Sequence, residues 1–249
     1  MNIQEFFETN NKVALGFSGG VDSSYLLYAA KEAGADIGAY YVKSQFQPQF
    51  ELDDALKLAE HVGAELKVLE CDVLSEPKVA SNPSDRCYYC KRHIFGAVAD
   101  RAAKDGYGVL IDGTNASDDA GDRPGTKALG ELKVLSPLRD CGLTKDDIRA
   151  LSKEAGLFTW NKPSYACLAT RIPEGEEITD KTLRRIEGAE DVLRMMGFSD
   201  FRVRKRGDIG LLQMPECQMI SAVKLNEEIV LGLKPYFKDV VLDLVGRRR

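Results

Sequence analysis

The sequence has no long hydrophobic stretch and no secretory signal at its start. No run of about 18 apolar residues occurs within its 249 residues, so a membrane-spanning helix is excluded. The opening residues, MNIQEFFETNNK, are acidic and polar and lack the basic and apolar regions of a secretory signal. We therefore expect a cytoplasmic protein, in which cysteine thiols stay reduced.

Positive charge is also in short supply, because 34 basic residues accompany 39 acidic ones and the net charge is -5. A general nucleic-acid binder needs a basic surface, so this balance argues against a nucleic-acid partner. The excess of acidic residues is confined to the first part of the chain. Residues 1–159 hold 18 basic and 25 acidic residues, whereas residues 160–249 hold 16 and 14. An anion-binding surface is therefore expected in the second part of the chain.

Histidines are few, only His61 and His93, and the six cysteines include a single CxxC pair, Cys87 and Cys90. A closed structural zinc site needs four ligands and is poorly supported. A redox pair and incidental cysteines near a helix start stay open as interpretations of the CxxC. Thiolates from Cys87, Cys90 and Cys167 would suit a [4Fe–4S] cluster with one iron left to bind sulfide, although spacing alone does not bring Cys167 to the pair. The remaining cysteines are expected to be buried structural thiols, namely Cys71, Cys141 and Cys217.

Short β-rich runs alternate with helical patterns through the first half of the chain. The expected strands are Val13–Phe17, Ile37–Val42, Leu66–Leu69, Gly108–Ile111 and Val134–Leu135. The expected helices are Ser23–Glu32, Leu52–Val62, Lys91–Lys104 and Thr144–Glu154, the last with a threonine N-cap. This order predicts an α/β fold built on a doubly wound parallel sheet.

The pattern changes near residue 160, and we place a boundary between residues 1–160 and residues 161–249. Residues 156–178 carry glycines and prolines typical of a loop, and Thr179 can cap a helix that runs to Met196. The remaining expected elements are strands Phe201–Lys205, Leu211–Met214 and Val240–Leu244 and a helix Glu216–Leu231. The second part is therefore expected to be a smaller α+β domain.

The strongest local motif is Ser18-Gly19-Gly20-Val21-Asp22-Ser23-Ser24, between the first expected strand and the first expected helix. We call residues 18–24 the phosphate loop. Its glycines let the backbone approach an anion, and the amides of Gly20 to Ser24 would point at a phosphate. Asp22 can hold Mg²⁺ or cap the helix. The loop lacks both the Walker A lysine and the GxGxxG spacing.

The phosphate loop resembles that of the N-type ATP pyrophosphatase superfamily, whose members cleave ATP between its α- and β-phosphates and adenylate a substrate oxygen. Asp112-Gly113-Thr114-Asn115 at the end of the fourth expected strand adds to the resemblance, because open α/β sheets bind ligands there. The resemblance implies that residues 1–160 form an ATP pyrophosphatase domain. It also implies that ATP is bound by Ser18, Gly19, Gly20, Val21, Asp22, Ser23 and Thr114.

Further blocks extend the resemblance to the LarE family of ATP-dependent sulfur transferases. They include RCYYCK at 86–91, DGTNASDDAGDRPG at 112–125, KPSYACLATRIPEGEEIT at 162–179 and LDLVGRR at 242–248. The resemblance implies an enzyme that uses ATP and Mg²⁺ to adenylate a carboxylate of a nicotinate-derived mononucleotide. The enzyme would then form a thiocarboxylate, a step in nickel-pincer nucleotide biosynthesis.

The family has two branches, which differ in their source of sulfur. One sacrifices the sulfur of the cysteine matching Cys167, and the other uses three cysteines to hold a [4Fe–4S] cluster as a reusable sulfur carrier. The presence of Cys87 and Cys90 indicates the second branch. The resemblance therefore implies a sulfide donor as a partner, together with a small-molecule carboxylate substrate and a homo-oligomer.

The resemblance also implies roles for residues near and beyond the boundary. Cys167, Asp122, Arg123 and Glu190 are the expected catalytic residues, and Arg202 and Arg204 match a pair that binds the substrate phosphate. Residues 161–249 would then be a substrate-binding and sulfur-transfer domain. Without the resemblance, the two arginines equally fit an exposed strand face, and Asp122 and Glu190 fit solvated carboxylates.

Other functions stay open at this point. They are [4Fe–4S]-dependent thiolation of tRNA or of another small-molecule acceptor, sacrificial sulfur donation from Cys167, and non-enzymatic sensing of ATP or a metal. The net charge of -5 weighs against tRNA, since RNA binding needs a basic surface.

Overall fold

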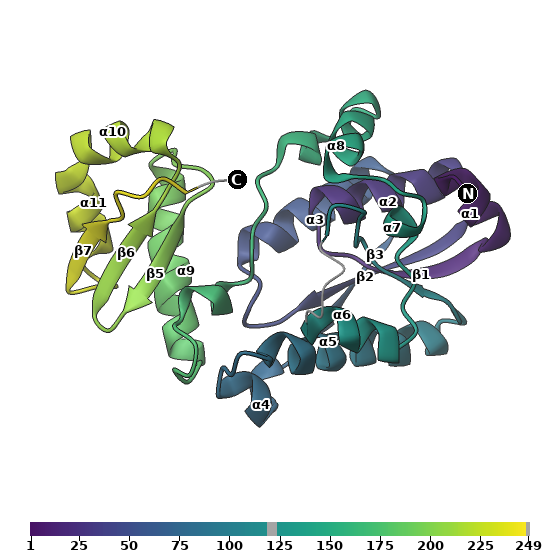
Figure 1. Cartoon of the computed structure of the whole chain (residues 1–249), viewed down its shortest axis with the longest axis horizontal. Coiled ribbons are helices and arrows are strands. Elements are labelled where there is room, and N and C mark those ends of the chain that lie inside the picture. Colours follow the sequence, from purple (N-terminus) through teal and green to yellow (C-terminus); the bar gives the residue numbers. More distant parts are fainter. Residues whose placement is uncertain (119–123, 248–249) are drawn as a thin grey trace. The chain divides into compact units, whose positions relative to one another are not determined.

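The computed structural model describes residues 1–118 and 124–247 of the chain (Figure 1). These residues form two compact units. The first consists of Met1–Val79 and Asp85–Lys162, and the second consists of Ala80–Ser84 and the residues from Pro163 onward. Among the described residues, no helix is long and apolar enough to cross a membrane.

The first unit is built on a parallel sheet of four strands in the order β3-β2-β1-β4. The strands are β1 (Lys12–Gly16), β2 (Asp36–Lys43), β3 (Leu66–Glu70) and β4 (Leu110–Ile111). The fifth strand expected at Val134–Leu135 is wrong, because Leu135 makes only an isolated parallel bridge with Ile111. All four strands coincide with runs that the sequence predicts.

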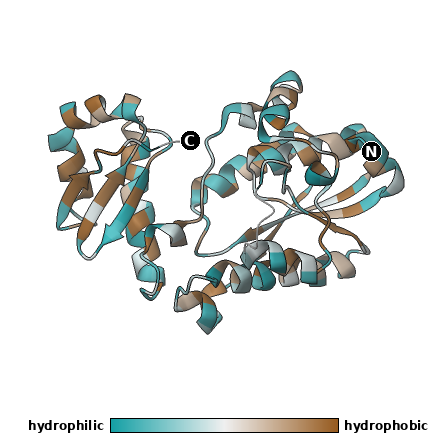
Figure 2. Ribbon diagram, in the orientation of Figure 1, coloured by the Kyte–Doolittle hydropathy of each residue, from teal (hydrophilic) through white to brown (hydrophobic). Residues whose placement is uncertain are grey.

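Helices cover both faces of this sheet, which confirms the predicted doubly wound α/β fold. Successive residues of β1 point to opposite faces. Leu15 packs in a core with Leu26 and Leu27 of α2 (Val21–Glu32), whereas Ala14 packs in a second core with Val98 of α5 (Arg86–Lys104). Figure 2 shows α5 as a mixture of hydrophilic and hydrophobic positions, as expected for a helix with one face against a sheet.

The other helices of the first unit connect or flank these strands. They are α1 (Ile3–Thr9), α3 (Gln49–His61), α4 (Pro77–Ala80), α5 (Arg86–Lys104), α6 (Pro124–Glu131), α7 (Pro137–Asp140) and α8 (Lys145–Glu154), with 3₁₀ turns at Val73–Ser75 and Phe158–Asn161. Thr144 caps α8 in a capping box with Asp147, which confirms the predicted N-cap. Helix α5 begins five residues before the predicted Lys91, so the CxxC lies inside the helix.

The second unit contains a three-stranded sheet in the order β5-β6-β7. Its strands are β5 (Arg202–Arg206), β6 (Ile209–Gln213) and β7 (Asp239–Leu242), with β5 antiparallel and β7 parallel to β6. Helix α9 (Asp180–Met195) is capped by Thr179, as predicted. The single helix expected after residue 215 is two helices, α10 (Glu216–Lys224) and α11 (Asn226–Leu233), because Leu225 interrupts the helical backbone.

Residues 80–84 belong to the second unit although they precede α5 in sequence. The Asn82 side-chain amide donates to the Pro173 carbonyl at 2.7 Å, and the Ile178 amide donates to the Ala80 carbonyl at 2.8 Å. The sequence does not predict that residues 80–84 belong to the second unit, because the two contacts join residues 91 and 98 positions apart. The loop expected over 156–178 contains a further 3₁₀ turn, η3 (Leu168–Arg171).

Candidate active site

The phosphate loop joins the carboxyl end of β1 to the amino end of α2, as the sequence predicts. Gly19 has a φ of +71°, which favours glycine, and a Cβ at this position would lie 3.0 Å from the Ala55 Cβ on α3. Gly20 is the N-cap of α2 and has no side chain to occupy the helix end. The first amides of α2 are therefore available to an anion such as a phosphate.

Two serine side chains brace this loop from within. The Ser18 and Ser23 hydroxyls lie 3.0 Å apart in a hydrogen bond, and the Ser18 amide donates to the Ser23 hydroxyl at 3.3 Å. Ser23 is buried, so its hydroxyl helps to fix the turn. Val21, the first residue of α2, is buried in the core beneath the loop. The direct contacts with ATP expected for these residues stay a prediction.

Asp22 is held by two side chains of the first unit. The Lys145 ammonium lies 2.5 Å from one carboxylate oxygen, and the Asn115 amide donates to the other at 3.4 Å. Burial raises the pKa of Asp22 above its usual range, and the nearby Lys145 opposes that rise. Protein sites for Mg²⁺ commonly use one or two carboxylates plus substrate phosphates, so the Asp22 carboxylate fits such a site.

The segment after β4 lies against the phosphate loop. A Cβ on Gly113 would lie 3.0 Å from the Ser23 amide nitrogen, so glycine fits here without displacing the Ser23 backbone. The Thr114 hydroxyl donates to the Asp112 carboxylate at 2.5 Å, and Ser136 donates to the same carboxylate at 2.8 Å. Thr114, predicted to bind ATP, thus orders the loop through Asp112, and its contact with ATP stays a prediction.

Lys162 is a residue of this site that the sequence reasoning did not select. Its ammonium lies 3.3 Å from the Gly19 carbonyl oxygen, 2.9 Å from the Asp54 carboxylate and 3.2 Å from the Glu51 carboxylate. The side chain is only 13% exposed. The block KPSYAC contained this lysine, and a basic residue within a matched block is the signal that could have identified it.

Cys87 and Cys90 lie in the first turn and a half of α5, and Cys167 lies in the second unit. Residues three apart on a helix share a face, so the two thiols of α5 can bind one metal centre. Cys87 is exposed and Cys90 is half-buried. Within the described part of either unit, no group of three histidine, cysteine, aspartate or glutamate side chains is arranged to hold a metal ion.

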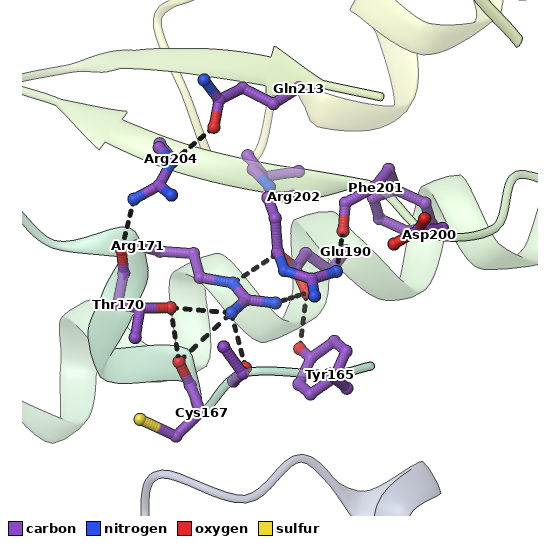
Figure 3. A network of polar contacts seen from close by, with 12 residues as sticks. Tyr165, Cys167, Thr170, Arg171, Glu190, Asp200, Phe201, Arg202, Arg204 and Gln213 are labelled. Carbon is purple, nitrogen blue, oxygen red and sulfur yellow. Dashed lines mark hydrogen bonds and ion pairs between the residues drawn. The ribbon is translucent and has the colours of Figure 1, made fainter. Parts of the chain in front are cut away.

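Cys167 is the N-cap of the 3₁₀ turn η3, and its carbonyl oxygen is one acceptor in a hydrogen-bond network (Figure 3). This oxygen accepts from the Thr170 amide at 3.0 Å and from the Thr170 hydroxyl at 2.9 Å. The Arg171 guanidinium donates to the same oxygen at 3.2 Å. The backbone at Cys167 is therefore fixed by three donors.

Glu190, predicted to be catalytic, is 1% exposed and accepts hydrogen bonds from several sides. Both of its carboxylate oxygens accept from Arg171, at 2.9 Å and 3.2 Å. The Tyr165 hydroxyl donates to it at 2.5 Å and the Val203 amide donates at 2.9 Å. Burial raises the pKa of Tyr165, and Glu190 raises it further. Glu190 therefore holds the Arg171 and Tyr165 side chains and the Val203 backbone in place. Its direct contact with a substrate stays a prediction.

Arg202 and Arg204 project from one face of β5 and hold backbone carbonyl groups. Arg202 is 3% exposed and donates to the Phe201 and Ser164 carbonyls at 2.6 Å and 2.5 Å. Burial lowers its pKa to about 10, with a contribution from Arg171. Arg204 is half-buried and donates to the Thr170 carbonyl at 2.6 Å. Their predicted role in binding a substrate phosphate stays a prediction. Asp122 and Arg123, also predicted to be catalytic, lie outside the described residues.

Comparisons with known proteins identify relatives of this chain. Residues 12–85 match the model of the family described as queuosine biosynthesis protein QueC. The chain is 34% identical to pyridinium-3,5-bisthiocarboxylic acid mononucleotide synthase of Lactiplantibacillus plantarum, over 95% of this chain and 87% of that protein. It is also 32% identical to an uncharacterized protein of a Synechocystis strain, over 98% of this chain and 93% of that protein.

A more distant similarity links the chain to enzymes that act on tRNA. It is 29% identical to the tRNA-specific 2-thiouridylase MnmA of Pseudothermotoga lettingae, over 67% of this chain and 58% of that protein. The similarity to the mononucleotide synthase is higher and spans nearly the whole chain. The chain therefore belongs to the LarE family of ATP-dependent sulfur transferases.

Proposed function

We propose that this enzyme adenylates a carboxylate of a pyridinium mononucleotide and converts it to a thiocarboxylate. The carboxylate oxygen attacks the α-phosphate of ATP, and pyrophosphate leaves. A sulfide then attacks the activated carbonyl carbon, and AMP leaves with the original oxygen. The observation that carries this proposal is the Gly19–Gly20 turn at the amino end of α2, which presents backbone amides to a phosphate.

The first unit supplies the residues for adenylation. Asp22 would hold Mg²⁺, which neutralises charge on the phosphates and orients the leaving pyrophosphate. Its partner Lys145, 2.5 Å away, would supply a positive charge beside the phosphate loop. Asp122 and Arg123 retain their proposed place near the reacting groups, from the resemblance alone.

We further propose that three thiolates, Cys87 and Cys90 of the first unit and Cys167 of the second, hold a [4Fe–4S] cluster. When bound, this cluster would supply sulfide at the iron that has no protein ligand. Soft thiolate ligands select such clusters over magnesium-type sites. A reducing cytoplasm would keep the three thiols available. The homo-oligomer implied by the resemblance stays part of this proposal.

The substrate would carry its phosphate to the second unit, where Arg204 is the more accessible of the β5 pair. Planar guanidinium groups bind phosphate with two parallel hydrogen bonds. Arg202 already donates to the Phe201 and Ser164 carbonyls. We therefore propose that it holds the backbone next to Tyr165 in place, in addition to making the predicted phosphate contact.

The test is acceptor-dependent formation of AMP and pyrophosphate by the full-length chain. Asp22→Asn should lower the rate by about 100-fold or more, since a metal contact supplies several kcal/mol of charge stabilisation. Glu32→Gln, at an exposed position on the same helix, is the matched control. Unchanged AMP formation in a folded Asp22→Asn protein would refute the assignment of the loop.

A tRNA acceptor is the second candidate, supported by the similarity to the 2-thiouridylases. The same assay distinguishes the two acceptors if pyridinium mononucleotide and bulk tRNA are supplied separately. We expect AMP release with the mononucleotide only. AMP release and thiolation with tRNA only would replace the proposed acceptor.

A further inference from the structure

Arginine side chains hold four carbonyl groups in the segment that carries Cys167. Arg202 donates to the Ser164 carbonyl, and Arg204 donates to the Thr170 carbonyl. Arg171 donates to two more, those of Ala166 at 2.6 Å and Cys167 at 3.2 Å. Such a short irregular segment has few hydrogen bonds of its own, so these donors set its conformation.

Arg171 is central to this arrangement and has no exposed surface. An unpaired charge at such a depth would be strongly destabilising. Glu190 offsets that penalty with a bidentate ion pair. The Tyr165 ring packs against the guanidinium, with 4.5 Å between its centroid and the Arg171 Cζ. Because all three guanidinium nitrogens donate hydrogen bonds and Tyr165 covers one face, the orientation of the guanidinium relative to the Cys167 backbone is fixed.

Thr170 completes the link between Arg171 and Cys167. Its hydroxyl accepts from Arg171 at 2.9 Å and donates to the Cys167 carbonyl at 2.9 Å. In Figure 3 the Cys167 sulfur lies on the side of the turn away from the Arg171–Glu190 pair. The network therefore fixes the backbone of Cys167, while its thiol points away from the Arg171–Glu190 pair.

We propose that Arg171, held by Glu190, is a positioning residue for sulfur transfer, which keeps the Cys167 thiol in one orientation by binding the Cys167 carbonyl. This inference rests on the proposed function for its kinetic consequence. A reacting group displaced by about 1 Å can lose about 100-fold in rate. Arg171 would thus affect the transfer of sulfur without contacting the substrate.

The principal variant is Arg171→Lys, which keeps a cation beside Glu190 but cannot bind the carboxylate and both carbonyls together. Thr170→Val removes the bridging hydroxyl, and Thr170→Ser restores it. Arg185→Lys is the matched control, because Arg185 also donates to a carbonyl, that of Tyr236, and lies over an aromatic ring, Phe237, in the same unit.

Two measurements are made on full-length protein. In the first, with ATP, sulfide and a pyridinium mononucleotide, Arg171→Lys should lower thiocarboxylate formation at least about tenfold. The KM for the acceptor should stay within about twofold, and pyrophosphate release should be retained, because the first unit is unchanged. Thr170→Val should show the same change to a smaller degree, and Thr170→Ser should restore the rate.

The second measurement is the rate at which iodoacetamide alkylates Cys167 after treatment with a chelator and a reductant, followed by mass spectrometry of the peptide. Loss of the hydrogen bonds from Arg171 and Thr170 to the Cys167 carbonyl should make alkylation about threefold faster, since the turn η3 then opens locally. Arg185→Lys should match the wild type in both measurements.

Equal transfer and alkylation rates in Arg171→Lys and Arg185→Lys would overturn the proposal. A parallel loss of pyrophosphate release and transfer in Arg171→Lys would also overturn it, because that pattern indicates a general structural defect. If the wild type releases no pyrophosphate with any acceptor, the proposed function fails. The alkylation rates then decide the positioning role by themselves. If Arg171→Lys does not fold, the Thr170 pair of variants decides it.

Discussion

The Lys162 ammonium lies 3.3 Å from the carbonyl oxygen of Gly19, a residue 143 positions earlier in the chain. This contact joins the last residue of the first unit to the turn of the phosphate loop. The same ammonium balances the carboxylates of Glu51 and Asp54 on α3. Lys162 thus couples three segments around the expected position of the ATP phosphates.

Replacement of Lys162 by Met should weaken ATP binding. The Gly19 carbonyl would lose a charged donor, and two neighbouring carboxylates would lose their cation. A hydrogen bond to a charged group contributes about 1.5–3 kcal/mol, so we expect the KM for ATP to rise about tenfold or more. Lys57→Met, at an exposed position of α3, serves as the control. The same KM in both variants would exclude a role for Lys162 in the loop.

Gly19→Ala should impair ATP use more than its effect on stability explains. Both Gly19 and Gly34 have a φ of +71°, but a Cβ meets Ala55 at 3.0 Å only at Gly19 and meets nothing within 4 Å at Gly34. Each alanine variant should lose about 1–2 kcal/mol of unfolding free energy from backbone strain. Only Gly19→Ala should raise the KM for ATP. If Gly34→Ala raises it equally, the effect comes from strain alone.

Glu190→Gln should destabilise the second unit. The substitution leaves the buried Arg171 guanidinium without its counter-charge, which costs about 3–5 kcal/mol in comparable buried pairs. Urea unfolding followed by circular dichroism would report this loss. Asp180→Asn removes an exposed pair with Arg184 and should change the free energy by less than about 1 kcal/mol. Similar midpoints for the two variants would contradict the buried ion pair.

The cysteines should divide into two classes when each is changed to Ser. Anaerobically prepared wild type should hold about four irons per chain, and Cys87→Ser, Cys90→Ser and Cys167→Ser should each lose them. Cys217 is exposed, like Cys87, so the expectation of a buried thiol is wrong at this position. Cys217→Ser is therefore a matched control that should keep its iron. Dehydroalanine at Cys167 in an iron-free protein that turns over once would instead support sacrificial sulfur donation.

Local signals in the sequence predict much of the fold. The glycines of the phosphate loop, the threonine caps of α8 and α9 and the apolar runs of the parallel strands all act over a few residues. The start of α5 is different. Its first residues, Arg86 to Cys90, include aromatic and cysteine side chains with only moderate helix propensity, and tertiary packing against α6 extends the helix over them.

Sequence patterns do not predict the buried ion pair between Glu190 and Arg171. A glutamate in an amphipathic helix is normally solvated, and an arginine in a loop is normally exposed. Each is buried because the other neutralises it, and the two lie 19 positions apart in different elements. Lys162 lies in a block that matches the family, but only the folded chain shows its contact with Gly19.

The most direct test of the central claim is product analysis in an anaerobic reaction of the full-length chain with ATP, Mg²⁺, sulfide and a pyridinium mononucleotide carboxylate. The account predicts a product in which sulfur replaces one carboxylate oxygen, with AMP and thiocarboxylate formed in equal amounts over repeated turnovers. AMP formation without any sulfur-containing product, or no acceptor-dependent AMP at all, would contradict it.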